Sequence, residues 1–533
     1  MRGQPARRPD SGGRSTVFGT RGAVACEHPQ AALAGIRALD DGGNAADACV
    51  AMAASMAVLA PMSTGMGGDA FLLFYDADTR RVIGANGCGR APRAATIEKL
   101  RGRGIKEMPE QGGLSVTVPG AVRLWEDAVK RLGRLTLSRL LEPAREAAEE
   151  GYPVSEVSAR YWEDGEELLE RDEAARTTFL PRGRAPKSGE VFRQPDLART
   201  LAAVAENGAD AFYEGEVAQS IARSTREAGG YLDEEDLTLH ETTWSEPIHT
   251  DYRGIRVYEI PPPGQGIAAL EMLNILEGFD LGALDALSAE RIHLEAEAKK
   301  LAFRDLYEKV GDPEFGEVPT EELLSKEHAA VLRGRISAGR AAASVEPVLG
   351  DDTIYACAVD AEGNGCSFIN SLFMRFGSGV VAEGTGVCLQ NRGYSFRLVE
   401  GHPNALAPGQ RPFHTIIPGL ATKDGALWAA FGVMGGSMQP QGHAQLLSNL
   451  VDHDMSPQEA VDHPRHRHEG GTLLVEGRVP EAEVEKLREM GHDVEVGADY
   501  AVPTGGAQII RVLENGARAG GSDPRKDGCA LAQ

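Results

Sequence analysis

DDTIYACAVD, residues 351–360, joins a loop to an apolar strand. The segment before it (ISAGRAAASVEPVLG, 336–350) is small and polar and lacks sustained periodicity, which is typical of a loop. Residues 353–360 and 366–373, with Glu-Gly-Asn between them, predict a β-hairpin of two apolar strands. Cleavage in front of the first strand exposes an N-terminal nucleophile, and Thr353 then needs no histidine because its own α-amino group serves as the base. In isolation, however, the β-propensity of Thr is the simpler explanation of its place.

Short motifs along the rest of the chain favour the nucleophile over β-propensity as the explanation of Thr353. They are GNAAD from residue 43, MGG from 66, DYRG from 251, PPPG from 261, EAKK from 297, GDP from 311, FGSG from 376, RP from 411, GGS from 435 and SDPR from 522. In this order and at these spacings, the chain resembles the γ-glutamyltranspeptidase family of self-processing N-terminal nucleophile (Ntn) hydrolases along nearly its whole length. Thr353 stands where that family keeps its nucleophile.

The resemblance implies both a fold class and a division of the chain. The fold is α/β (α+β), a four-layer αββα Ntn-hydrolase sandwich formed by both halves of a self-cleaved chain. The cleavage site lies between Asp352 and Thr353, so residues 19–352 form the large (α) subunit and residues 353–533 the small (β) subunit. The partner of each fragment is then the other fragment, in a heterodimer, and a dimer of such heterodimers stays an open alternative. Alternating strands and helices with glycine turns are by themselves typical only of stacked sheets flanked by helices.

Periodicity and punctuation predict the individual elements. Helices are expected at 29–40, 45–59, 137–150, 194–206, 216–228, 288–310 and 442–453, and further strands at 70–75, 250–260, 427–433, 472–476 and 507–512.

The composition excludes several classes of partner. The formal net charge is -24, with 79 acidic against 55 basic side chains, so nucleic acid and anionic membranes are not expected as partners. Residues 1–18 begin with an Arg-, Gly- and Pro-rich stretch without an apolar core, which predicts a disordered arm and no secretory signal. Seven cysteines, an odd number and mostly in apolar segments, do not suggest a disulfide framework. A cytoplasmic protein is therefore expected.

The resemblance assigns catalytic roles to four residues. Thr353 attacks the carbonyl of Asp352 in an N→O acyl shift, and after cleavage its hydroxyl attacks a substrate amide to form an acyl-enzyme. Gly435 and Gly436 match the glycine pair whose backbone amides bind the oxyanion. Ser371 matches a second hydroxyl that supports the nucleophile. Without the resemblance, the glycines indicate a tight turn and Ser371 an ordinary strand residue.

The residues that read a glutamyl group in the family are replaced here. Cys88 stands at the position of the Arg that grips the substrate α-carboxylate, with Arg90 shifted beside it, and Ser395 stands for the Asp that holds the α-amino group. Phe373 takes the place of an Asn that contacts substrate, and HT at 414–415 replaces a serine pair. The resulting pattern resembles a γ-glutamyltransferase-like subgroup that includes an oxamate amidohydrolase. The expected substrate-binding residues are Arg90, Asn391, Arg392, Ser395, His414 and Thr415, with Arg392 pairing a carboxylate.

The expected function is that of a self-processing N-terminal-threonine amidohydrolase or acyltransferase, for which the family label is glutathione and γ-glutamyl hydrolysis and transfer. One alternative is a small-acid amidase such as an oxamate amidohydrolase, acting on a small amide that bears a carboxylate. A second is a relative that binds ligand without cleaving itself. No cofactor and no metal are expected, although His463, His466 and His468 lie close enough in sequence to raise the metal alternative.

Overall fold

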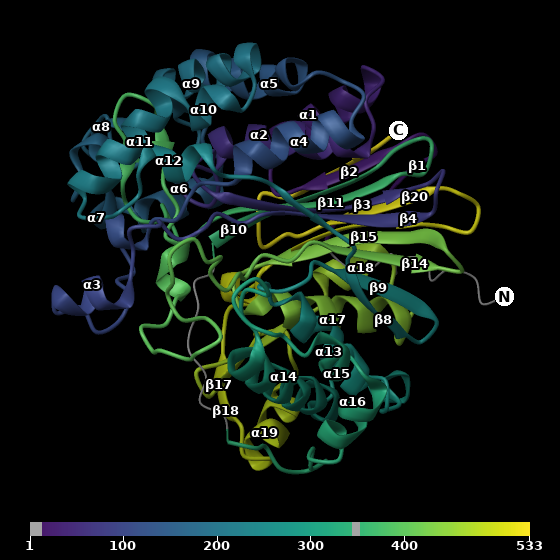
Figure 1. Cartoon of the computed structure of the whole chain (residues 1–533). Helices are drawn as coiled ribbons and strands as arrows, with labels where there is room; N and C mark the ends of the chain where they lie inside the picture. Colours follow the sequence, from purple (N-terminus) through teal and green to yellow (C-terminus); the bar gives the residue numbers. More distant parts are fainter. Residues whose placement is uncertain (1–12, 344–351) are drawn as a thin grey trace.

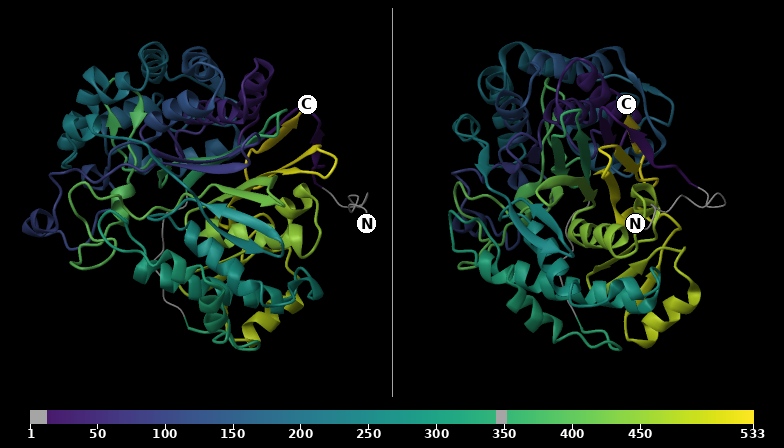
Figure 2. Two further views of the ribbon diagram at one scale, coloured as in Figure 1. Left: turned by 45° about the vertical axis from the view of Figure 1, so that its right-hand side comes forward. Right: turned by 90° about the vertical axis from the view of Figure 1, so that its right-hand side faces the viewer.

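The computed structural model describes residues 13–343 and 352–533, apart from the side chain of Asp352. Two seven-stranded sheets lie face to face, with a layer of helices on the outer face of each (Figure 1), and the turned views of Figure 2 show the same stacking. The predicted four-layer αββα architecture is confirmed. One apolar cluster fills the space between the sheets. Two larger clusters lie outside it, and each of them joins one sheet to the helices that cover it.

The strands of both sheets come from distant parts of the chain. The first sheet has the spatial order β21 (Cys529–Ala532), β2 (Ala23–Cys26), β10 (Asp352–Val359), β11 (Gly365–Phe373), β3 (Asp69–Asp76), β4 (Arg81–Gly87) and β7 (Thr243–Ser245). The second has the order β1 (Val17–Gly19), β20 (Arg518–Ser522), β19 (Gly506–Val512), β15 (Ala426–Met434), β14 (Gly419–Lys423), β9 (Ile255–Glu259) and β8 (Ile248–Tyr252). Smaller sheets are formed by β5 (Tyr152–Pro153) with β6 (Val191–Phe192), by β12 (Val381–Ala382) with β13 (Val387–Cys388), and by β16 (His466–Glu469), β17 (Thr472–Val475) and β18 (Asp493–Val496).

Each helical layer belongs to one sheet. The layer on the first sheet contains α1 (Pro29–Asp40), α2 (Ala45–Leu59), α4 (Ala121–Leu132), α5 (Leu137–Glu150), α6 (Glu156–Glu163), α7 (Glu166–Leu169), α8 (Glu173–Phe179), α9 (Pro195–Asn207), α10 (Asp210–Tyr213), α11 (Gly215–Glu227) and α12 (Glu234–Thr238). The layer on the second sheet contains α13 (Gly266–Leu276), α14 (Ala289–Lys309), α15 (Thr320–Leu323), α16 (Lys326–Arg333), α17 (Met438–Val451) and α18 (Pro457–Asp462). Outside these layers, α3 (Ile97–Gly102) packs in a small separate cluster and α19 (Glu481–Glu489) packs with α14 and β17.

Strand β10 lies in the middle of the first sheet, and its sequence explains why. It pairs antiparallel with β2 on one side and with β11 on the other. Ile354 and Ala356 belong to the cluster under the helices, whereas Tyr355 and Cys357 belong to the cluster between the sheets. A strand buried on both faces needs apolar residues at every position, which is what this run supplies. The segment that follows the predicted cut is therefore at the centre of the fold.

The structure corrects two predictions. The strand expected over 250–260 is a hairpin of β8 and β9, because Arg253 and Gly254 both adopt a positive φ and form the turn between them. The prediction of a disordered arm over 1–18 is wrong at its C-terminal end. Val17 and Phe18 belong to β1, which pairs with β20 at the edge of the second sheet. Residues 1–12 lie outside the described part of the chain.

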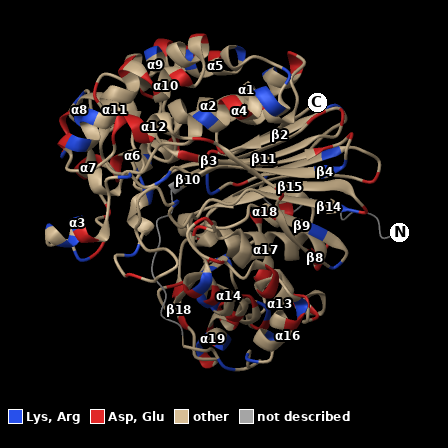
Figure 3. Cartoon of the chain, in the orientation of Figure 1, with Lys and Arg blue, Asp and Glu red and all other residues tan. Residues whose placement is uncertain are grey.

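Charged residues are frequent on the helical layers and sparse along the stacked sheets (Figure 3). Among the described helices, none combines the length and the apolar character needed to cross a bilayer.

Candidate active site

Thr353 is the second residue of β10, and its side chain is buried. Its Oγ1 donates a hydrogen bond to Oγ of Ser371 at 3.1 Å, and that same oxygen accepts the backbone N–H of Phe373 at 2.8 Å. The β10–β11 register shifts between Asp352, opposite Phe373, and Ile354, opposite Asn370. Two residues of β11 therefore face Thr353 alone, and such a bulge re-aims a side chain locally. The predicted nucleophile and its supporting hydroxyl are brought together.

Gly435 and Gly436 form a turn directly after β15. Their φ values are 128° and 55°, so both lie in the region that glycine adopts most readily. Neither backbone N–H donates to an acceptor within the described residues, while Gly436 O accepts from Gln439 N at 3.2 Å. Two unengaged backbone donors at the end of a buried strand are suited to an anionic oxygen.

The glycine turn lies at the Thr353 end of β10. Two close approaches fix the direction in which β15 crosses the hairpin. A Cβ on Gly365, at the far end of the hairpin, would meet Leu427 at 2.5 Å, and a Cβ on Gly432 would meet the ring of Tyr355 at 2.3 Å. Along β15, the direction from Leu427 to Gly432 therefore leads toward Thr353. The glycine turn follows Gly432 in the same direction.

Gln265, at the N-terminus of α13, connects the glycine turn to the segment after β13. Its side-chain Nε2 donates to the carbonyl of Gly436 at 2.8 Å and to the carbonyl of Thr415 at 2.5 Å. The side chain is fully buried, and its backbone N–H donates to His414 O at 3.0 Å. One amide group thus fixes the spacing of two segments at the site.

Arg392 is a fully buried guanidinium with most of its donors unused. Its carbon Cζ lies 4.0 Å from the ring centre of Phe373, and Nη1 donates to Oγ1 of Thr415 at 2.8 Å. Nε and Nη2 have no hydrogen-bond partner among the described atoms. Because Phe373 is paired with Asp352, this guanidinium lies close to the start of β10. Buried donors without partners are costly, and a carboxylate is the group that matches an arginine fork.

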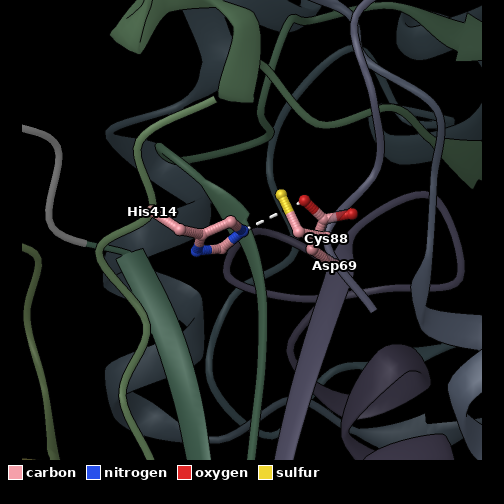
Figure 4. Close-up of side chains that lie close together, drawn as sticks. All are labelled: Asp69, Cys88 and His414. Atoms are coloured by element: carbon pink, nitrogen blue, oxygen red, sulfur yellow. Dashed lines mark hydrogen bonds and ion pairs between the residues drawn. The ribbon is translucent and has the colours of Figure 1, made fainter. Parts of the chain in front are cut away.

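Asp69, the first residue of β3, lies close enough to Arg392 for their charges to interact, and both of its carboxylate oxygens accept hydrogen bonds. Its Oδ1 accepts from the backbone N–H groups of Gly89 (3.0 Å) and Gly120 (3.1 Å) and from Nε2 of Gln390 (2.8 Å). Its Oδ2 accepts from Nε2 of His414 at 3.0 Å, the contact drawn in Figure 4. This carboxylate ties together β3, the segment after β4 and the segment that carries His414.

Burial also shifts the pKa values of Asp69 and of the residues around it. Ile416 N donates to Nδ1 of His414 at 3.3 Å, so the ring proton is on Nε2. Burial, followed by the charge of Arg392, lowers the pKa of His414 well below its usual value. Burial raises the pKa of Asp69 to about 6 although Arg392 opposes the change, and burial lowers the pKa of Arg392 to about 10 against the attraction of Asp69. The pKa of Cys88 is raised by burial and by Asp69, so its thiol stays neutral.

Hydrogen bonding accounts for this cluster without a metal. Potential ligand atoms of Asp69, Cys88 and His414 lie within 4.8 Å of one another, as Figure 4 illustrates. Oδ1 of Asp69 already accepts three hydrogen bonds, however, and Nε2 of His414 carries the proton, so this nitrogen has no lone pair for a metal in this tautomer.

The three later histidines, His463, His466 and His468, belong to none of the clusters of potential metal ligands within the described residues. His466 Nε2 lies 3.4 Å from a carboxylate oxygen of Glu295, whereas His463 Nε2 lies 3.3 Å from the carbonyl of Ala286.

Three of the expected substrate-binding residues have other partners. Arg90 is half-exposed and pairs with Glu314 at 2.9 Å. Asn391 donates to the carbonyl of Glu110 and accepts from the N–H of Met374. The hydroxyl of Ser395 lies 2.9 Å from the carbonyls of Arg392 and Phe413. In this arrangement Arg90 compensates an acidic side chain, and the other two support the loop that carries Arg392.

Two residues of the site, Asp69 and Gln265, were not predicted from the sequence. A charged residue directly before the apolar run of β3 was a usable signal for Asp69, because a buried carboxylate requires several donors. Gln265 lies between two glycines with no distinguishing pattern.

Comparison with known proteins identifies relatives along the whole chain. A family model described as Gamma-glutamyltranspeptidase matches residues 31–533. The glutathione hydrolase-like YwrD proenzyme of Bacillus subtilis is 41% identical over 97% of this chain and 99% of its own length. The oxamate amidohydrolase proenzyme of Klebsiella pneumoniae is 34% identical over 97% and 99%. The crystal structure of cephalosporin acylase from Bacillus halodurans superposes with a TM-score of 0.93 at 42% identity, covering 100% of this chain and 99% of that one. The chain therefore belongs to the gamma-glutamyltranspeptidase family.

Proposed function

We propose that this protein is a self-processing amidohydrolase or acyltransferase that uses Thr353 as its N-terminal nucleophile. The observation that carries the proposal is the buried Thr353 hydroxyl, bonded to Ser371 at the start of a central strand, in a chain of this family. Relatives across the full length are named as proenzymes of hydrolases and acylases, which supports both the cleavage and the amide chemistry.

The site residues supply the parts that this chemistry needs. In the precursor, Oγ1 of Thr353 attacks the carbonyl carbon of Asp352, and the C–N bond breaks, which frees the α-amino group and leaves an ester. Hydrolysis of that ester then releases the Thr353 hydroxyl and a carboxylate on Asp352. The freed amine has an ordinary pKa of about 7.7–8.0, so it acts as a base near neutral pH. In turnover, the hydroxyl attacks the substrate amide, the N–H groups of Gly435 and Gly436 stabilise the oxyanion, and water or an amine resolves the acyl-enzyme.

The cut divides the chain into residues up to 352 and residues 353–533, which stay together as a heterodimer. We place the protein in the cytoplasm, an assignment supported by its seven free cysteines, six of them buried.

Mass spectrometry of the denatured protein tests the processing step. Wild type should yield fragments of 352 residues and 533 − 352 = 181 residues, the second beginning at Thr353. Thr353→Ala should remain a single inactive chain, because nucleophile and base are the same residue. A wild-type chain that stays whole, or a fragment with another N-terminus, would refute the assignment and favour the relative that only binds ligand.

The substrate we favour is a small amide that bears a carboxylate beside or near the scissile carbonyl. The unused Nε and Nη2 donors of Arg392 offer one carboxylate a two-point contact. Cys88 and Ser395 provide no charge for a glutamyl α-carbon, and the pKa of Cys88 is raised. Comparing kcat/KM for oxamate and related acid amides with that for glutathione and a γ-glutamyl anilide tests this choice. Faster γ-glutamyl turnover would restore glutathione and γ-glutamyl hydrolysis as the function.

A further inference from the structure

An ion pair buried in α14 has no part in the active site described above. Glu297 and Lys300 lie one helical turn apart and form a 2.6 Å contact between Nζ and Oε1, with side chains only 3% and 7% exposed. Burying two charges is costly unless the remaining donors and acceptors are also satisfied. The groups that bind the remaining donors and acceptors of Glu297 and Lys300 therefore indicate what the ion pair does.

Both partners bind the backbone of a single residue, Ala342. The N–H of Ala342 donates to both carboxylate oxygens of Glu297 at 3.2 Å, and its carbonyl accepts from Nζ of Lys300 at 2.8 Å. Contact with the N–H and the carbonyl of one residue fixes the position and the direction of the chain, whatever its side chain. The pair acts as a clamp on the backbone.

Two neighbouring contacts hold the same segment. Nε2 of His293, on the same helix, lies 2.7 Å from the carbonyl of Ser337, and the N–H of Ala341 donates to the carbonyl of Met490 at 2.8 Å. Nδ1 of His293 in turn lies 2.8 Å from Nε2 of His492. The chain from Ser337 to Ala342 is thus attached to α14 and to the end of α19.

The clamp stands at a defined distance from the predicted cut. Ala342 precedes Asp352 by 352 − 342 = 10 residues, and Asp352 is itself fixed by pairing with β11. Fixing both ends of a short connection limits the directions from which the chain enters β10. Intramolecular attack on the Asp352 carbonyl depends on that direction, because small displacements of the reacting groups reduce rates strongly.

We propose that Glu297 and Lys300 are positioning residues for self-cleavage, which hold the chain upstream of the cut in the register that presents the Asp352 carbonyl to Thr353. This inference rests on the proposed function, since it assumes cleavage at that bond. The clamp is not needed for turnover, because neither side chain contacts Ser371, the glycine turn or Arg392. The same clamp keeps the end of the large subunit attached after the cut.

The test compares cleavage with turnover in full-length variants. Glu297→Gln and Lys300→Met break the ion pair with little change in size, and Glu308→Gln, on an exposed position of α14, is the matched control. Each chain is made by cell-free translation, and the cut fraction is followed on denaturing gels. We expect the two clamp variants to be cut about tenfold to a hundredfold more slowly than wild type and the control.

A second measurement separates positioning from general stability. Once cut, the clamp variants should show kcat and KM per cut chain within about twofold of wild type. The double variant Glu297→Gln/Lys300→Met leaves no unpaired buried charge, so the melting temperature of its precursor should be close to that of the control while its cleavage stays slow. Wild-type cleavage rates in both variants would overturn the proposal. Equal losses of cleavage, turnover and melting temperature would overturn it too, since they indicate an ordinary structural ion pair. Failure of wild type itself to be cut at Thr353 would instead defeat the proposed function.

Discussion

Replacing Arg392 with Met removes the group that we propose binds the substrate carboxylate through Nε and Nη2, which have no partner among the described atoms. Charge-assisted hydrogen bonds contribute about 1.5–3 kcal/mol each, so losing both costs roughly 3–6 kcal/mol. Each 1.36 kcal/mol is about tenfold in rate, which predicts a loss of roughly 10²–10⁴ in kcat/KM for an acid amide. Arg392→Lys keeps the charge without the fork, so it should lose one bond and roughly 10–10².

The assay must separate loss of a substrate contact from damage to the site. Arg392 also stacks on Phe373, bonds Thr415 and compensates the charge of Asp69, so its removal has general effects as well. Oxamate and its uncharged counterpart oxamide differ only at the carboxylate, and ammonia release measures both. The ratio of the two kcat/KM values isolates the carboxylate contact.

Arg90→Met is the matched control, because its guanidinium already pairs with Glu314. Its ratio of oxamate to oxamide should equal that of wild type. If Arg392→Met lowered both substrates by the same factor, the carboxylate would bind elsewhere and the reasoning from the unused donors would be refuted.

Three further predictions concern the turn, its support and the buried carboxylate. Gly436→Ala should lower kcat by roughly 10²–10³ if one oxyanion donor is lost. The control is Gly425→Ala, at a positive φ in an open turn, which should lower only the free energy of unfolding, by about 1–2 kcal/mol. Gln265→Glu places a carboxylate against two carbonyls and should lower kcat by roughly 10–10² while gels still show a cut chain; unchanged turnover would exclude a positioning role. The pKa of Asp69 is about 6 in the folded protein against about 3.9 unfolded, so its contribution to stability is present below pH 4 and is lost as the pH rises through 6. The free energy of unfolding of wild type relative to Asp69→Asn should therefore fall by roughly 2 kcal/mol between pH 4 and 7, and parallel pH profiles would contradict this.

Local signals explain which elements were predictable. The bounds of α1, α2 and α5 match the expected ranges, because their ends carry chemistry that is visible in the sequence. Asn44 and Asp47 form a capping box at α2, and Thr136 caps α5. The hairpin of β8 and β9 was read as one strand because the turn at Arg253 uses a left-handed conformation that arginine rarely adopts.

Long-range contacts explain what was not predictable at the site. Gln265 meets Gly436 across 171 residues of sequence, and no local pattern reports such a partner. Arg90 was expected to bind substrate because Glu314, its partner 224 residues away, could not be known. Motif resemblance located Thr353, Ser371 and the glycine pair, since these are the positions at which the motifs fall; their roles remain predictions.

The position of β10 between β2 and β11 has a consequence for refolding. β2 precedes the predicted cut, while β10 from Thr353 onward, β11 and the edge strand β21 follow it, so cleavage at that bond would leave each sheet woven from two chains. The precursor folds as one molecule, with a closure entropy that grows only slowly with loop length. The mature enzyme, once unfolded, must bring two separate chains together, and its recovery becomes a concentration-dependent, second-order event. Cleavage therefore turns a protein that refolds by itself into one whose lifetime is set by how slowly it first unfolds.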